Sequence, residues 1–244
     1  MGFQEFIVLQ FLAHVLADYF LQTNALANQK NTLGFKSRFL IWHTLIVFVT
    51  SWLLSFQIEF FIGSGVIAIS HYFIDGIKAK YNNHSILKKS IFFIDQGLHI
   101  LVLIIVSWLF TEYHGLKFII ELPIDANTIG IITAYLFCLK PTNILIKEVF
   151  KSSEIDVAIT NMDIDTSLDT NELPNAGKLI GILERLLTLT FILVGQYAAV
   201  GFLIAAKSIL RYKDTDTLKT EYVLIGTMLS FGTAVLLGIL TSFF

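Results

Sequence analysis

Long apolar runs separated by short polar connections dominate the chain. A helix needs about 20 apolar residues to cross a bilayer, and most of the runs approach that length. The run at 127–150 contains Lys140 and Pro141, so it is expected to be kinked or re-entrant. The pattern predicts an all-α polytopic membrane protein with about seven transmembrane helices, in a range of six to eight. The expected spans are 3–22, 39–56, 61–78, 91–110, 127–150, 186–206 and 222–243.

The polar connections divide the chain into four predicted parts. Residues 1–110 form a four-span bundle, and residues 111–150 supply a fifth span. Residues 151–175 form an acidic polar loop with six carboxylates and one lysine, Lys151. Residues 176–244 hold the C-terminal spans.

The amino-acid composition supports the prediction of a membrane protein and reduces the number of possible functional classes. Of the 244 residues 55% are hydrophobic and 15% are charged, whereas soluble domains carry about 25% charge. An ordinary soluble enzyme is therefore nearly ruled out, and a net charge of −2 gives no reason to expect a nucleic-acid partner. The single cysteine, Cys138, excludes an intramolecular disulfide. Residues 1–10 lack a basic region, so the first apolar segment is expected to remain as a helix.

Two connections are basic and contain no acid, which predicts the orientation. Because cytoplasmic loops are enriched in lysine and arginine, segments 23–38 and 78–90 are expected to be cytoplasmic and the N-terminus outside. This arrangement suits a multi-pass membrane protein, with membrane lipids as its surroundings. The basic residues are Lys30, Lys36, Arg38, Lys78, Lys80, Lys88 and Lys89.

Ionisable residues lie inside the first four spans, where they are costly and indicate a functional site. Three histidine–aspartate pairs have a spacing of four residues, so each pair shares one helix face. A fourth histidine lies in the second span. The resulting candidates are His14, Asp18, His43, His71, Asp75, Asp95 and His99.

These residues are expected at similar depths from one membrane face. At 1.5 Å per residue, Asp18, His43, Asp75 and Asp95 lie about 5–6 Å from the cytoplasmic ends of their spans. The other three histidines lie roughly 10–12 Å deep. One shared level predicts a single polar cluster inside a four-helix bundle.

Imidazole and carboxylate groups on facing helices are typical ligands of divalent metals. We therefore expect the seven residues to bind zinc or manganese, in an unspecified number of ions. Gln22, Gln96 and Lys78 are expected to surround these ligands. Two alternatives remain open, namely a proton or ion relay and buried ion pairs that fix helix register. Lys78 is also expected to anchor its span end at the lipid headgroups.

The same residues carry a family resemblance. The runs Leu12–Thr23, Ser70–Lys78 and Phe92–His99, with His43, resemble a bacterial inner-membrane family of unknown function. That family's N-terminal pattern is similar to predicted membrane-bound metal-dependent hydrolases. Segments at 181–185, 205–209 and 221–227 also resemble the unknown-function family. The resemblance implies a reaction class but no substrate and no catalytic residue.

The resulting functional hypothesis is a metal-dependent hydrolase that acts at the cytoplasmic face on a phosphoester or lipid-linked substrate. The rival is a non-enzymatic membrane protein, either a metal or proton-coupled transporter or a metal-stabilised partner-binding protein. The outer halves of the first four spans are nearly all apolar, which favours a one-sided site over transport. Charged residues bracketing 186–206 are expected to reach the membrane interface or to form a second polar site. They are Glu184, Arg185, Lys207, Arg211 and Glu221.

Overall fold

A computed structural model describes residues 2–82, 89–119, 124–153, 176–211 and 217–243. These residues form helices and no strands, as the hydropathy pattern predicts. The acidic loop, apart from its first three residues, and Lys88 lie outside the described residues. Contacts divide the chain into two units, Met1–Thr133 and Ala134–Phe243, and each is described by itself.

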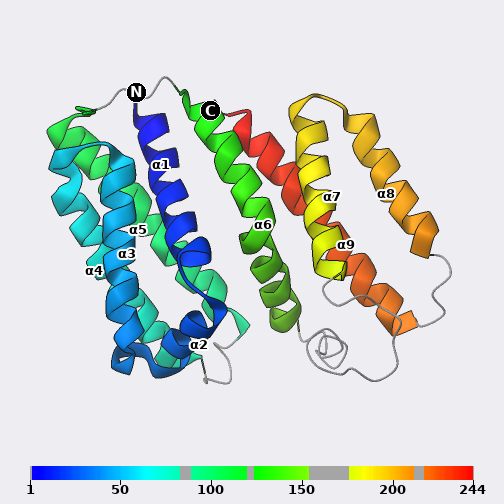
Figure 1. The fold of residues 1–244 in the computed structure, drawn as a ribbon, viewed down its shortest axis with the longest axis horizontal. Coiled ribbons are helices and arrows are strands. Elements are labelled where there is room, and N and C mark those ends of the chain that lie inside the picture. Colours follow the sequence, from blue (N-terminus) through cyan, green and yellow to red (C-terminus); the bar gives the residue numbers. More distant parts are fainter. Residues whose placement is uncertain (1, 83–88, 120–123, 154–175, 212–216, 244) are drawn as a thin grey trace. The chain divides into compact units, whose positions relative to one another are not determined.

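The first unit is a four-helix bundle with a fifth helix across one end (Figure 1). Its long helices are α1 (Phe3–Val15), α3 (Arg38–Ser55), α4 (Phe61–Tyr81) and α5 (Ile91–His114). In the order α1, α3, α4, α5 and back to α1, each helix contacts the next, so the four close around a common interior. That interior receives side chains from every helix, which is how residues distant in sequence come to share one site.

A sharp bend after α1 places α2 (Asn24–Leu33) across the bundle end. The π-helix η1 (Leu16–Phe20) continues α1, and the path then turns by 93°. Thr23 Oγ1 caps α2 by accepting a hydrogen bond from Leu26 N (3.3 Å). The short 3₁₀ turns η2 (Gly34–Lys36) and η3 (Ile58–Phe60) precede α3 and α4. The basic connection 23–38 is therefore largely helical and packs against α3 and α4.

Five of the described helices are long and apolar enough to cross a membrane, or six if the bent α1–α2 pair counts as one span. Six spans are the lower end of the range of six to eight that the hydropathy pattern predicts. The five cover 38–55, 58–81, 91–114, 126–152 and 220–241, close to the predicted boundaries. The molecule is an all-α polytopic membrane protein.

The second unit contains most of α6 (Ala126–Ser152), with α7 (Ala176–Leu193), α8 (Tyr197–Arg211) and α9 (Thr217–Thr241). The prediction of one continuous span at 186–206 is wrong. The chain reverses between α7 and α8 at Gly195, whose φ of +73° suits only glycine without strain. Helix α7 packs against both α8 and α9.

Helix α6 runs through Pro141 as one continuous helix, so residues 127–150 do not form the re-entrant segment that was one of the expectations. Proline lacks the N–H that would bond to Phe137 O, and the Thr142 hydroxyl donates to that carbonyl instead (2.8 Å). The next carbonyl, of Cys138, accepts a hydrogen bond from Arg185 Nε (2.8 Å).

Arg185 was expected to reach the membrane interface or a second polar site, and the interface expectation is wrong. Its side chain is 2% exposed, and its two other nitrogens donate to Ser230 Oγ (3.0 Å) and Asn143 Oδ1 (2.7 Å). The guanidinium thus ties α7 to α6 and α9. Lys207 pairs with Glu184, joining α8 to α7.

Candidate metal centre

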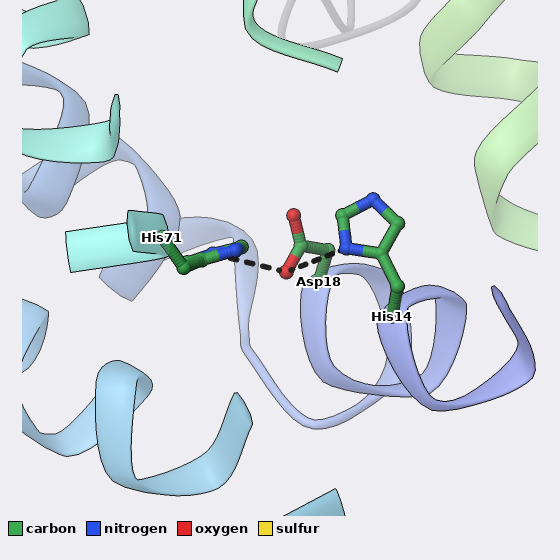
Figure 2. A group of neighbouring side chains, drawn as sticks. All are labelled: His14, Asp18 and His71. Atoms are coloured by element: carbon green, nitrogen blue, oxygen red, sulfur yellow. Dashed lines mark ion pairs between the residues drawn. The ribbon is translucent and has the colours of Figure 1, made fainter. Parts of the chain in front are cut away.

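The first helix contributes His14 and Asp18 through an unusual backbone. His14 lies in the last turn of the α1 helix. Asp18 lies in the π-helix η1, a conformation often found at functional sites. Figure 2 shows the Asp18 carboxylate between the rings of His14 and His71. Its Oδ1 atom is 3.9 Å from His14 Nδ1 and 3.4 Å from His71 Nε2. The Gln22 side chain donates to the backbone carbonyl of Asp18 and so supports the turn that follows η1.

Helices α3 and α4 bring His43, His71 and Asp75 to the same point. His43 and His71 approach through their Nε2 atoms at 3.0 Å. Asp75 Oδ2 is 3.2 Å from His71 Nε2 and 3.6 Å from His43 Nε2. His43 Nε2 is also 3.3 Å from Asp18 Oδ1. All four residues are at most 7% exposed.

The two histidine nitrogens have the spacing of metal ligands toward each other and toward both carboxylates. Ligands about 2.0–2.2 Å from a tetrahedral zinc ion lie about 3.3–3.6 Å from one another. The Nε2 atoms of His43 and His71 lie 3.0 Å from each other, and each lies 3.2–3.6 Å from Asp18 Oδ1 and from Asp75 Oδ2. Most exceed the usual N–H···O hydrogen-bond length of about 2.9–3.0 Å. We call these four residues the first centre.

Asp95 and His99 lie on the α5 side of the same cluster. His99 Nε2 is 3.5 Å from Asp95 Oδ1 and 3.8 Å from Asp75 Oδ1. The His99 ring stacks on the ring of His71, with centroids 3.9 Å apart. All seven residues named from the sequence are thus buried in one connected group, and three overlapping sets of them have the geometry to hold an ion.

Lys78 faces this group, so the expectation that it anchors the span at the headgroups is wrong. Its ammonium is 2.7 Å from Asp95 Oδ2, and its side chain is 12% exposed. Gln96 donates to the same oxygen (3.1 Å) and accepts a hydrogen bond from the Tyr19 hydroxyl (2.9 Å). Both residues therefore fix the orientation of the Asp95 carboxylate.

Lys30 is a member of the group that the sequence analysis missed. Helix α2 places its ammonium 2.6 Å from Asp75 Oδ2, and the residue is only 4% exposed. This placement depends on close packing between η2 and α4. A Cβ atom at Gly76 would lie 2.2 Å from the ring of Phe35, so only glycine admits that ring.

The two lysines change the charge balance of the group. Lys30 pairs with Asp75 and Lys78 pairs with Asp95. With neutral histidines, three carboxylates and two ammonium groups leave one net negative charge. Among the described residues, Asp18 is the aspartate of the group that no lysine or arginine contacts, and it faces three imidazole nitrogens instead. A buried net charge is costly, so the site favours one more positive charge beside Asp18.

A few buried polar residues lie between this group and the other end of the bundle, among side chains that are mostly apolar. Gln10 donates to Ser51 O (3.1 Å) and accepts from Ser51 Oγ (2.6 Å). Ser64 and Ser107 are also fully buried. A small cavity of about 10 Å³, room for one water molecule, connects the two levels. Its polar lining comes from Gln10, His14, Thr50, Ser51, His71 and His99.

The comparison with known families covers this unit. Residues 6–122 match the model of a family described as a protein of unknown function, DUF3307. The match spans just under half of the chain and includes every residue of the buried group. It does not reach 176–240, where the sequence also resembled the unknown-function family. No curated protein and no solved structure matches the chain, and no match links it to metal-dependent hydrolases.

Proposed function

We propose that this membrane protein holds a zinc or manganese ion at the first centre and uses it for hydrolysis. The observation that carries the proposal is that His43 Nε2 and His71 Nε2 both lie at ligand spacing from each other, from Asp18 Oδ1 and from Asp75 Oδ2. Two neutral imidazoles and two carboxylates are donors that suit both metals. A divalent ion would also supply the positive charge that Asp18 lacks.

The cavity beside the centre supports a hydrolytic role. A metal ion lowers the energy needed to ionise a bound water and polarises a substrate oxygen. The cavity has room for about one water molecule and is lined by His14, His71 and His99. His14 lies at the edge of the centre, with Nδ1 3.9 Å from Asp18 Oδ1. With a metal ion bound, His14 would be placed to accept a proton from a water molecule in this cavity.

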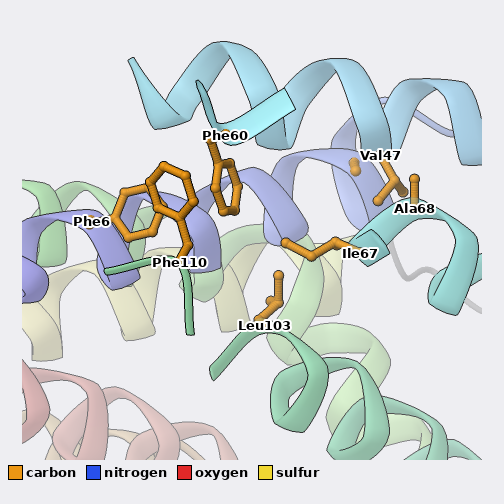
Figure 3. Close-up of a cluster of buried hydrophobic side chains, with 8 residues drawn as sticks. Phe6, Val47, Phe60, Ile67, Ala68, Leu103 and Phe110 are labelled. Atoms are coloured by element: carbon orange, nitrogen blue, oxygen red, sulfur yellow. The ribbon is translucent and has the colours of Figure 1, made fainter. Parts of the chain in front are cut away.

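An aromatic cluster argues against the rival transporter. One helical turn beyond Gln10 and Ser107, the rings of Phe6, Phe60 and Phe110 pack together with centroids 4.9–5.8 Å apart (Figure 3). All three are at most 7% exposed. A conduction path would have to cross this apolar layer, whereas a hydrolase needs access from one side only.

The basic end of the bundle suggests the substrate class. Lys36, Arg38 and Lys80 are exposed at the end of the bundle that holds the site. Basic residues at a membrane surface attract anionic lipid headgroups. We therefore propose a phosphoester, free or lipid-linked, at the cytoplasmic face of a bacterial inner membrane.

Full-length protein in detergent tests the hydrolase directly. With manganese or zinc added, it should cleave bis(p-nitrophenyl) phosphate or phosphatidylglycerol in mixed micelles. The His71→Ala variant should cleave the same substrate at least about 100-fold more slowly. Gly97→Ala is the matched control, because a Cβ there meets nothing within 4 Å. If metal-loaded wild-type protein is no faster than His71→Ala on either substrate, the hydrolase proposal is wrong.

A further inference from the structure

We infer that the buried group contains a second metal position, formed by Asp75 Oδ1, Asp95 Oδ1 and His99 Nε2. The inference rests on the first centre proposed above and makes that centre binuclear. Ligand atoms from these three residues lie within 4.8 Å of one another. His99 Nε2 is 3.5 Å from Asp95 Oδ1 and 3.8 Å from Asp75 Oδ1. Both distances are too long for a hydrogen bond and close to the separation of two ligands on one ion.

Unpartnered atoms give the second, independent indication. Asp95 Oδ1 and His99 Nε2 are buried and make no hydrogen bond within the described part of the chain. Buried polar atoms are normally satisfied, and exceptions call for an explanation such as an ion. Lys78 and Gln96 both bind the other oxygen of Asp95, so its Oδ1 atom is turned toward His99.

Asp75 is placed to bridge the two positions. Its Oδ2 atom faces His43 and His71, while its Oδ1 atom faces His99. One carboxylate that gives one oxygen to each of two ions is a common arrangement in hydrolases, where the ions lie about 3.5–4 Å apart. The stacked rings of His71 and His99 keep the two positions adjacent.

The second ion would also define what the site binds. With neutral histidines the group carries one net negative charge without metal, so two divalent ions would raise its net charge to three positive charges. Such a site favours an oxyanion that touches both ions. The phosphate of a phosphoester, which carries its charge on several oxygens, fits that requirement.

Manganese binding to the metal-stripped full-length protein in detergent tests the inference. Equilibrium dialysis should give two Mn²⁺ per chain, with an exchange-coupled electron paramagnetic resonance spectrum. His99→Gln and Asp95→Asn should each lower this to one ion with an uncoupled six-line spectrum. Gly97→Ala, on the same helix, should retain both ions.

The outcomes separate this inference from the proposed function. One uncoupled ion in wild-type protein, or two ions retained in both variants, would overturn the second position and leave the first centre intact. No ion in wild-type protein would overturn both. A variant that fails to fold does not remove the test, because the wild-type stoichiometry decides it alone.

Discussion

Replacing Lys30 by methionine should destabilise the protein strongly without metal and clearly less when metal is bound. Methionine keeps much of the volume but removes the ammonium that lies 2.6 Å from Asp75 Oδ2. Removing one partner of a buried ion pair costs about 3–5 kcal/mol, because the remaining charge is uncompensated. For a protein of this size, 1 kcal/mol shifts the thermal midpoint by about 2–4 °C. The metal-free variant should therefore unfold about 6–20 °C below wild type.

An ion in the first centre would supply the missing charge to Asp75. The loss should then shrink by about 2 kcal/mol or more when zinc or manganese saturates the protein. Because folding and binding are linked, the same free energy should appear as metal binding about 30-fold tighter in Lys30→Met than in wild type. Thermal unfolding in detergent, with chelator and with metal, measures the first quantity, and a metal titration measures the second.

Lys80→Met is the matched control, because Lys80 is an exposed lysine on the same helix as Asp75. It should change stability by no more than about 0.5 kcal/mol in either condition. The contrary result is an equal loss for Lys30→Met with and without metal, together with an unchanged metal affinity. That result would mean that no ion shares Asp75 with Lys30.

Three further predictions concern packing and orientation. Gly76→Ala should displace Phe35 and lower the thermal midpoint, because its Cβ would lie 2.2 Å from the ring; Gly97→Ala, measured in the same unfolding assay, should not. Arg185→Lys should destabilise the second unit by about 1.5–3 kcal/mol, since lysine cannot reproduce three directed hydrogen bonds; unchanged unfolding in detergent would contradict its role. Lys36→Cys should not be labelled by an impermeant maleimide in intact cells if the basic end is cytoplasmic. Labelling would show that this end faces the outside.

The buried group could be predicted from the sequence because two simple regularities coincide there. Histidine and aspartate four residues apart share a helix face, and hydropathy places the span ends. Together they place the three histidine–aspartate pairs at a similar depth from one membrane face. In the structure these side chains lie close together. Neither regularity depends on the tertiary arrangement, which is why a single sequence sufficed.

Lys30 and the π-helix could not be predicted in the same way. Lys30 is one of several basic residues in a connection, and only the 93° bend and the packing of Phe35 on Gly76 turn it inward. Asp18 fits a regular i, i+4 pattern, which gives no sign of the π conformation. Arg185 looked like an interfacial residue because its partners, the carbonyl of Cys138 and two polar side chains, lie on other helices.

The reversal at Gly195 was missed for a different reason. Residues 186–206 contain no charge, and hydropathy alone does not separate one span from two shorter helices. A glycine followed by Gln196 was the local signal, because glycine favours the positive φ at which helices end.

The metal content of gently purified full-length protein decides whether the buried group is a metal centre. Elemental analysis should find at least one zinc or manganese per chain in wild-type protein and in Gly97→Ala. It should find a loss of metal in His43→Gln, which removes a ligand of the first centre. Added metal should raise the thermal midpoint of stripped wild-type protein but not that of His43→Gln. Wild-type protein that carries no metal, and gains no stability from zinc or manganese, would contradict the account and leave the buried group as ion pairs or a proton relay.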